Sequence, residues 1–274
     1  MSDISSESLK IHTELAEELP PEVFEGEVAL QPGPDTHLYS QRKDGALGGE
    51  QLRMLQIRLL ELQSQRPFKR LLITSANRGE GKTHFATNLA LTFASEGHRV
   101  LLIDADVRNP SVHTACGIPN SYGLKDWLQE GGNPWRAVRK IKRKNLYVIT
   151  GGTAAGESFR SSTIAQFQIM LDRFAPAFDL IVLDSAPLLG VVDTKLVSSL
   201  ADAALLVVRA GTTSRDHVVQ AMELLEGQNI LGAVLNRVDP NLPCFTSYYA
   251  YASPAPPTPA KGAGASLSLR TDRR

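Results

Sequence analysis

Six short apolar runs recur along the middle of the chain. They lie at residues 71–73, 100–103, 146–149, 180–183, 205–208 and 231–235. Uninterrupted runs of Leu, Ile and Val are typical of strands buried on both faces of a sheet, because a strand with one wet face alternates apolar and polar residues. The pattern therefore predicts six strands in the interior of a parallel sheet.

Segments with helical spacing separate these runs, at 83–96, 161–174 and 214–226. Alternating strands and helices predict an α/β fold with a mostly parallel central sheet flanked by helices on both faces. In such sheets ligands bind at the carboxyl ends of the strands. The polar residues that follow each apolar run are therefore the candidates for a functional site.

The first run leads into the sequence SANRGEGKT, residues 75–83, followed by a helical pattern. This order predicts the phosphate-binding loop of a P-loop NTPase, with Ala76 in place of the usual first glycine. A glycine-rich turn that merely starts a helix is the alternative, but it does not require Gly-Lys-Thr between a strand and a helix. The lysine is expected to reach the β- and γ-phosphates and the threonine hydroxyl to ligate Mg²⁺. The expected nucleotide-binding residues of the loop are Arg78, Gly79, Glu80, Gly81, Lys82, Thr83 and His84.

Aspartates follow the second apolar run and the fourth. Asp104 and Asp106 are two residues apart at a strand end, so both can face the loop. Asp184 follows four apolar residues, which is the Walker B arrangement that holds Mg²⁺ directly or through water. A single aspartate at such a position can instead cap the next turn, and for Asp106 or Arg108 alone that alternative stays open.

Asn236 ends the last apolar run. Its side chain can donate to and accept from an adenine edge, or it can close an Asx turn, and the sequence favours neither. We include it with Arg108 among the expected nucleotide-binding residues.

Composition narrows the classes of protein. The chain has 274 residues with 29 basic and 29 acidic side chains, so its zero net charge argues against a dedicated nucleic-acid-binding protein. Its two cysteines, Cys116 and Cys244, lack zinc or disulfide spacing and are expected to be free thiols. The N-terminus lacks a secretory pattern, and no run reaches the ~20 apolar residues of a membrane helix. We expect a cytoplasmic protein with no membrane span of its own.

Charge and proline content divide the chain into three parts. Residues 1–40 hold nine acidic side chains and one basic one, so residues 1–47 are expected to form a disordered acidic arm. Residues 48–239 are expected to form the nucleotide-binding domain, and residues 240–274 a Pro/Ala-rich tail. The run at 136–144 holds six cations and is expected to be a solvated face, or else to contact anionic lipid or an acidic segment.

The motifs together resemble the bacterial tyrosine kinases of capsular and exopolysaccharide synthesis. Three carry the resemblance: the loop GEGKT at 79–83, the box Asp104-x-Asp106-x-Arg108, and LDxxP at 183–187. Septum-site and partition ATPases, from the same superfamily, typically carry a second lysine where this chain has Asn77. A family stretch Glu-x-x-Arg-x-x-Arg, implicated in self-association, is matched by Glu50 and Arg53 but has Gln56 at its last position.

The resemblance implies transfer of the γ-phosphoryl group of ATP to a tyrosine hydroxyl. Lys82, Asp104, Asp106 and Asp184 would be catalytic, and Thr83, Asp104 and Asp184 would hold Mg²⁺. Either Asp104 or Asp106 would be the base. Tyr248, Tyr249 and Tyr251 match the family's phosphoacceptor cluster. A membrane polysaccharide co-polymerase would activate a homo-oligomeric kinase and recruit it to the inner face of the plasma membrane. The alternatives are a partition- or septum-type ATPase switch and a nucleotide-binding regulator without kinase activity.

Overall fold

The computed structural model describes residues 26–33, 38, 47–155 and 159–239. The chain divides into two units, Met1–Arg237 and Val238–Arg274. Every helix and strand of the described residues belongs to the first unit. The three tail tyrosines and Cys244 lie outside the described residues, so their predicted roles stay predictions.

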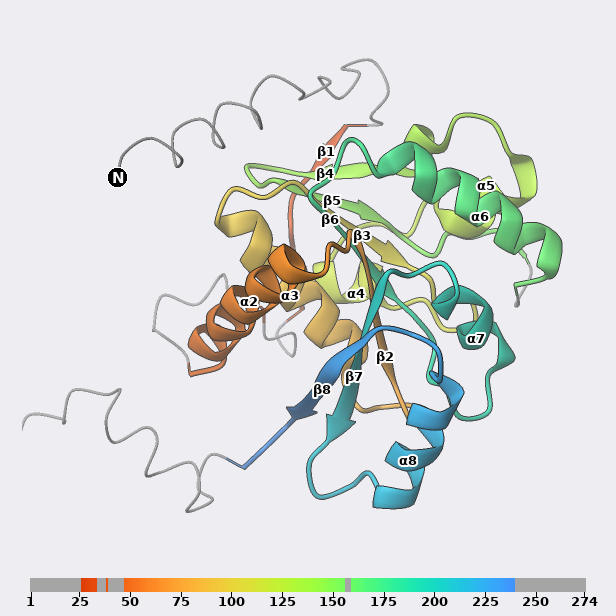
Figure 1. The fold of residues 1–274 in the computed structure, drawn as a ribbon. Helices are drawn as coiled ribbons and strands as arrows, with labels where there is room; N and C mark the ends of the chain where they lie inside the picture. Colours follow the sequence, from red (N-terminus) through yellow and green to blue (C-terminus); the bar gives the residue numbers. More distant parts are fainter. Residues whose placement is uncertain (1–25, 34–37, 39–46, 156–158, 240–274) are drawn as a thin grey trace, which may run out of the picture. The chain divides into compact units, whose positions relative to one another are not determined.

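The first unit is built around a mostly parallel sheet, as predicted (Figure 1). The strand order is β1-β4-β5-β3-β6-β2-β7-β8, and only the β4–β5 pair is antiparallel. All six predicted strands are present, but the run at 231–235 belongs to an edge strand, β8, which is only partly buried and does not lie in the interior as predicted. The strands are β1 (Glu27–Val28), β2 (Arg70–Ser75), β3 (Val100–Asp104), β4 (Arg139–Ile141), β5 (Leu146–Ile149), β6 (Leu180–Asp184), β7 (Ala203–Arg209) and β8 (Ile230–Asn236).

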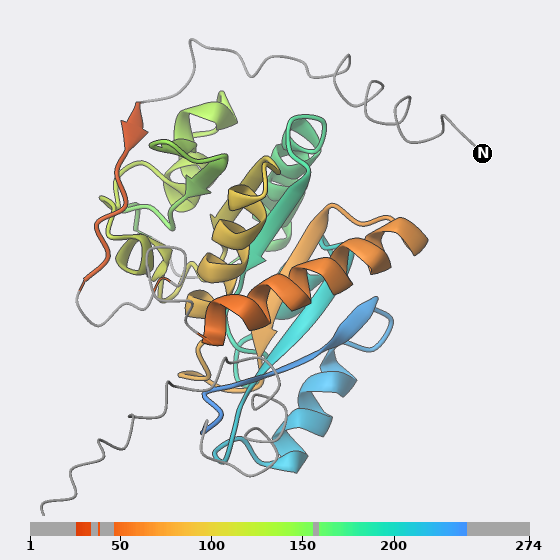
Figure 2. The same ribbon diagram turned by 90° about the vertical axis from the view of Figure 1, so that its left-hand side faces the viewer.

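Helices cover both faces of the sheet. One face carries α2 (Leu47–Gln65), α3 (Lys82–Ser95) and α4 (Val112–Cys116), and the opposite face carries the others. Figure 2 shows α2 and α3 in front of the sheet, with β1 near one edge and β8 near the other. The opposite face carries α5 (Leu124–Glu130), the 3₁₀ helix η2 (Pro134–Ala137), α6 (Ser161–Phe174), α7 (Val192–Ser198) and α8 (Arg215–Leu224).

The strand residues divide between two buried layers. In β3, Leu101 and Ile103 face the layer under α5 to α8, whereas Val100 and Leu102 face the layer under α2 to α4. Successive side chains of a strand point to opposite faces, so a strand between two helical layers is apolar at every position. This explains why the runs lack alternation.

Two parts of the chain differ from the sequence prediction. Residues 26–33 were assigned to a disordered arm, yet β1 pairs with β4 and the Gln31 N–H donates to the Cys116 carbonyl at 3.1 Å. The basic run was expected to be solvated or to contact an acidic segment; Arg136, Lys142 and Arg143 are exposed, and Lys140 pairs with Glu27 at 2.9 Å. Arg139 of β4 differs, because it is only 6% exposed and donates to the Arg136 and Val138 carbonyls. The sequence prediction missed both strands because they hold two and three residues, too few to show a period.

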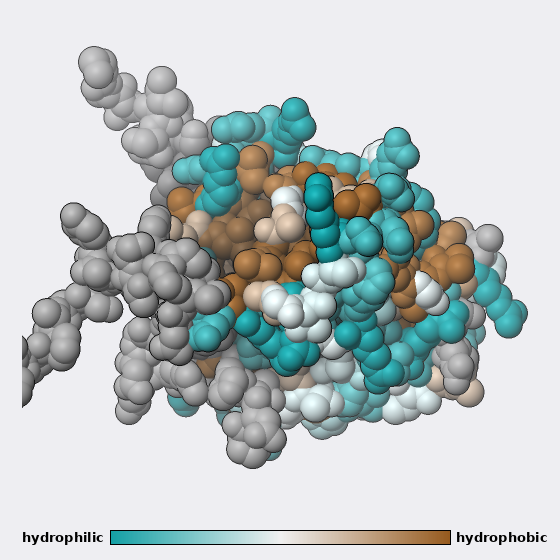
Figure 3. All heavy atoms as spheres, turned by 90° about the horizontal axis from the view of Figure 1, so that it is seen from below, coloured by the Kyte–Doolittle hydropathy of each residue, from teal (hydrophilic) through white to brown (hydrophobic). Residues whose placement is uncertain are grey.

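The sequence also predicted no membrane-spanning helix and free cysteine thiols. No helix among the described residues is long and apolar enough to cross a membrane. Exposed large apolar side chains are spread over several elements, and the face viewed in Figure 3 mixes hydrophobic with hydrophilic side chains. Cys116 is a free thiol, as predicted, and burial raises its pKa to about 12, so it is unreactive.

Strand β8 forms the edge of the sheet beyond β7 and is irregular. Its register against β7 shifts between Ala204 and Leu205, which pair with Ile230 and Gly232 respectively. Gly232 has φ +155°, a conformation that favours glycine. The shift leaves Leu231 as an extra residue, which makes this a β-bulge.

Candidate functional site

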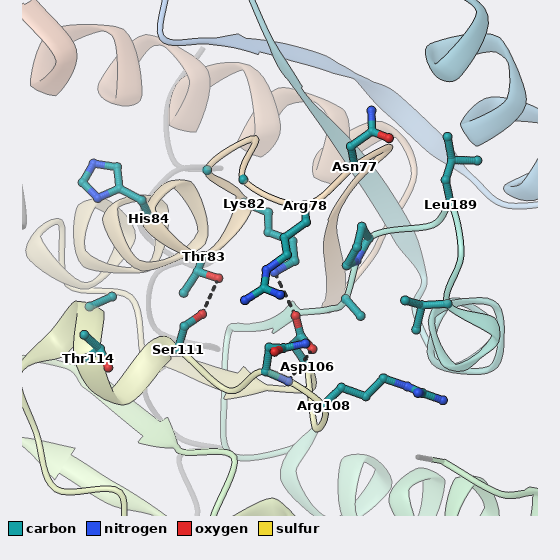
Figure 4. Close-up of a pocket in the computed structure, with 17 residues that line it drawn as sticks. Asn77, Arg78, Lys82, Thr83, His84, Asp106, Arg108, Ser111, Thr114 and Leu189 are labelled. Atoms are coloured by element: carbon teal, nitrogen blue, oxygen red, sulfur yellow. Dashed lines mark hydrogen bonds and ion pairs between the residues drawn. The ribbon is translucent and has the colours of Figure 1, made fainter. Parts of the chain in front are cut away.

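The carboxyl ends of three adjacent strands place the predicted motifs together. Strands β3, β6 and β2 are consecutive neighbours in the sheet, so Asp104 and Asp184 pair in register and the loop after β2 lies beside them. A cavity of about 660 Å³ opens over this point, lined mainly by the loop, the segment after β3 and the segment after β6. Figure 4 shows its lining side chains.

The loop after β2 presents the start of α3 to this cavity. Gly81 precedes the helix with φ +92°, and no side chain caps the first turn. This positive φ favours glycine, and a Cβ at Gly81 would in addition lie 2.3 Å from Asn236 Nδ2 and force that side chain to move. Uncapped N–H groups and the helix dipole make such a terminus a site for an anion.

Lys82 and Asp106 meet across the cavity. The Lys82 ammonium lies 3.0 Å from Asp106 Oδ2, with side chains 13% and 3% exposed (Figure 4). Burial lowers the pKa of Lys82, but the charges of Asp184, Asp106 and Asp104 outweigh it and raise the pKa. The lysine is therefore a fixed positive charge beside the helix terminus.

Asp104 and Asp184 lie beneath this pair and are fully buried. Asp104 Oδ2 accepts from the N–H groups of Ser111 and Val112, whereas its Oδ1 and both oxygens of Asp184 have no hydrogen-bond partner. Burial, together with the Asp184 charge, raises the pKa of Asp104 well above its ordinary value. Burial also raises the pKa of Asp184 to about 6, although the Lys82 charge acts in the opposite direction, as does the Thr83 hydroxyl, which is nearby but not in hydrogen-bond geometry.

These unpartnered carboxylate oxygens fit a divalent cation. Thr83 Oγ1 lies 2.9 Å from Ser111 Oγ at the same place, so hydroxyl and carboxylate oxygens gather at one point. No cluster of three or more His, Cys, Asp or Glu side chains able to hold a metal occurs within the described ranges. Mg²⁺ typically takes one or two carboxylates and completes its shell with water and substrate phosphates, so two carboxylates and a hydroxyl suit it.

The remaining predicted residues fall into two groups. Arg78, Gly79, Gly81, His84 and Arg108 line the cavity. Glu80 is instead buried behind the loop, where its Oε1 accepts from Thr213 and Asn77.

Asn236 is also engaged behind the loop. Its Nδ2 donates to the Glu80 carbonyl at 2.8 Å and its Oδ1 accepts from the Arg237 N–H. Asn236 is not among the residues that line the cavity, so its role at an adenine base stays a prediction.

Several residues that build the site carried no sequence signal. Asp193, on α7, holds Arg108 with an Nε–Oδ2 distance of 2.9 Å, but lies 85 residues away in the sequence. Ser111 contacts Thr83 and holds Asp104 through its backbone. Its place directly after Asn109-Pro110, where a helix begins, was the only available hint.

Comparison with known proteins is consistent across sequence and structure. The model of the CobQ/CobB/MinD/ParA nucleotide binding domain matches residues 71–248. The tyrosine-protein kinase YwqD of Bacillus subtilis is 34% identical over 70% of this chain and 81% of its own length. The kinase domain of the Escherichia coli tyrosine kinase ETK superposes with a TM-score of 0.64 at 28% identity, covering 70% of this chain and 77% of that one. The chimerical protein CapA2B2 shares the fold, with a TM-score of 0.68 at 24% identity over 84% of this chain and 98% of its own.

Proposed function

This chain belongs to the bacterial tyrosine-protein kinases of capsule and exopolysaccharide synthesis, a branch of the CobQ/CobB/MinD/ParA nucleotide-binding family, and from that premise we propose how its cleft phosphorylates tyrosine. The cleft binds ATP with Mg²⁺. The bond between the β,γ-bridging oxygen and the γ-phosphorus breaks, a bond from the tyrosine oxygen to that phosphorus forms, and ADP leaves.

Phosphate recognition is assigned to the loop and Lys82. The uncapped N–H groups at the start of α3 and the Lys82 ammonium bind the phosphates, and Thr83, Asp104 and Asp184 hold Mg²⁺. When bound, Mg²⁺ neutralises charge on the phosphate oxygens. The observation that carries this assignment is the fully buried Asp104–Asp184 pair with unpartnered oxygens beside Thr83.

We assign the base role to Asp106 and the ligand role to Asp104. Asp106 lines the cavity, where an incoming hydroxyl would arrive, and among the described residues only Lys82 contacts its Oδ2. Asp104 does not line the cavity, and one of its oxygens is already engaged by two backbone N–H groups. When Lys82 turns to the phosphates, Asp106 becomes free to accept the phenolic proton.

Incubation with Mg²⁺ and γ-labelled ATP, followed by phosphosite mapping, tests the function. The expected result is label on tyrosine, lost in the Asp106→Asn variant, with nucleotide binding retained. Label released only as phosphate would identify an ATPase switch of the partition type. Nucleotide binding without transfer or hydrolysis would identify a regulator that lacks kinase activity.

The partner and location are assigned from the family. By analogy with the family, we propose that a separate membrane co-polymerase recruits the chain to the inner face of the plasma membrane. The likeness to CapA2B2 supports this only through the shared fold. Co-sedimentation of the chain with membranes that do or do not contain such a partner tests the assignment.

Transfer to the tail is expected to occur between subunits. Tyr248 follows Val238 by ten residues, a reach of at most ~35 Å, and Pro240 and Pro243 stiffen that path. A full-length Lys82→Met chain is mixed with an active chain that lacks residues 240–274. Mass spectrometry is expected to find phosphate on Tyr248, Tyr249 or Tyr251 of the inactive chain.

The control is the Lys82→Met chain incubated alone, which should stay unlabelled. If the tail also stays unlabelled in the mixture, while the truncated chain phosphorylates an added tyrosine polymer, transfer between subunits is excluded.

In the self-association stretch of α2, Glu50 and Arg53 are exposed but Gln56 is only 4% exposed, so position 56 faces the interior. A subunit contact made through this stretch would therefore use Glu50 and Arg53.

A further inference from the structure

The charged side chains that line the cavity are three cations and one carboxylate. They are Arg78, Lys82, Arg108 and Asp106. Lys82 is paired with Asp106 at 3.0 Å, and Arg108 is paired with Asp193 at 2.9 Å. Arg78 differs from both, because none of the described residues forms a hydrogen bond or ion pair with its side chain.

Arg78 lies in the middle of the phosphate-binding loop, between Asn77 and Gly79. Figure 4 shows its guanidinium directed into the cavity on the same side as Lys82, whereas Asn77 points the other way. The Asn77 amide is held outside by Glu80 Oε1 and His217 Nδ1, both at 3.1 Å. Gly79, next along the chain, has φ +83°, a backbone conformation that favours glycine.

We propose that Arg78 contacts the γ-phosphate of bound ATP and stabilises the charge of that group during its transfer. This inference rests on the proposed function and adds a second cation to Lys82, supplied by the same loop. A guanidinium offers two parallel N–H donors that match two oxygens of one phosphate. Because no carboxylate of the described residues pairs with it, Arg78 breaks none of the ion pairs seen in the structure when it binds the phosphate, whereas Lys82 must first leave Asp106.

The position of Arg78 assigns it to the terminal phosphate. The N–H groups at the start of α3 are expected to hold the inner phosphates and Lys82 to reach the β- and γ-phosphates. The Arg78 guanidinium enters the cavity from the middle of the loop, on the side from which the acceptor tyrosine would approach the γ-phosphate. A contact at the γ-phosphate distinguishes ATP from ADP. A contact at the base or at an inner phosphate affects both nucleotides equally.

Nucleotide binding by the full-length chain tests the proposal without requiring transfer. Isothermal titration with Mg²⁺ compares ADP with adenylyl imidodiphosphate, an ATP analogue that resists transfer. Arg78→Ala should weaken binding of the analogue at least ~10-fold and change ADP binding less than twofold, and Arg78→Lys should fall between. In the wild-type background, Arg78→Ala should also lower kcat for tyrosine phosphorylation by at least ~10²-fold.

Arg66→Ala is the matched control, because Arg66 is an exposed arginine outside the cavity, and it should change neither affinity. Equal weakening of both nucleotides by Arg78→Ala would overturn the proposal, as would unchanged affinity for both. A wild-type chain that shows this binding pattern but labels no tyrosine would overturn the proposed kinase function while leaving the γ-phosphate contact in place.

Discussion

Replacing Lys82 with methionine is expected to lower the rate of tyrosine phosphorylation at least ~10³-fold. Lys82 is the first residue of α3 and its side chain is largely buried, and methionine keeps its length but removes the charge that the phosphates require. Phosphotransfer from labelled ATP measures the loss. Near-normal activity in a folded Lys82→Met chain would show that the loop does not bind the transferred phosphate.

The same change also leaves Asp106 without its cation. Asp106 is 3% exposed and, of its partners among the described residues, would keep the Asn109 N–H at 3.1 Å, so Lys82→Met is expected to destabilise the nucleotide-free chain by about 1–3 kcal/mol. A double variant, Lys82→Met with Asp106→Asn, should recover much of that stability but none of the activity. This pair separates a lost phosphate contact from a damaged fold. Recovery of activity in the double variant would contradict the role of Lys82.

Replacing Asp184 with asparagine is expected to have opposite effects on activity and stability. Activity should fall at least ~10²-fold, because the carboxylate that would hold Mg²⁺ is lost. The metal-free, nucleotide-free chain should become more stable at pH 8, on the order of 2 kcal/mol, since a fully buried carboxylate with no hydrogen-bond partner is removed.

The raised pKa of Asp184 determines the direction in which stability changes with pH. In the folded chain Asp184 has a pKa of about 6, above its ordinary 3.8, so the folded state binds the proton more tightly than the unfolded state. Stability is therefore lost as pH rises from about 4 through 6, and the loss is complete above the folded pKa. Thermal unfolding from pH 4 to pH 8 in a chelator should show a shallower decline for Asp184→Asn. An identical decline in both chains, with a lower Tm for the variant at pH 8, would contradict this account.

The interior of the sheet was predictable because each strand carries its own signal. Strands β3 and β6 are apolar at each position before their closing aspartates, since helices cover both faces, and the phosphate loop is a local pattern of nine residues. Residues such as Lys82, Thr83 and Asp184 could therefore be assigned to one site before any coordinates. Parallel strands bring their carboxyl ends to the same edge without further information.

Long-range pairings could not be predicted in the same way. Two contacts, Arg108 with Asp193 and Asn236 with Glu80, join residues far apart in the sequence. No sequence motif includes both partners of either contact. The prediction that Arg139 would be solvated was wrong for a different reason. A cluster of cations is normally solvated, but backbone carbonyls at Arg136 and Val138 satisfy this guanidinium inside the fold.

The two edges of the sheet have a consequence for how the protein behaves at high concentration. Exposed edge strands offer unpaired N–H and C=O groups to other chains, which promotes aggregation. Here β1 covers the outer side of β4 with only two residues, and the bulge at Leu231 makes β8 a poor template for straight pairing. A shortened chain that begins at residue 47 would lose the cover on β4 but keep the bulge on β8. The shortened chain should therefore aggregate first through its β4 edge, which is several strands away from the phosphate loop.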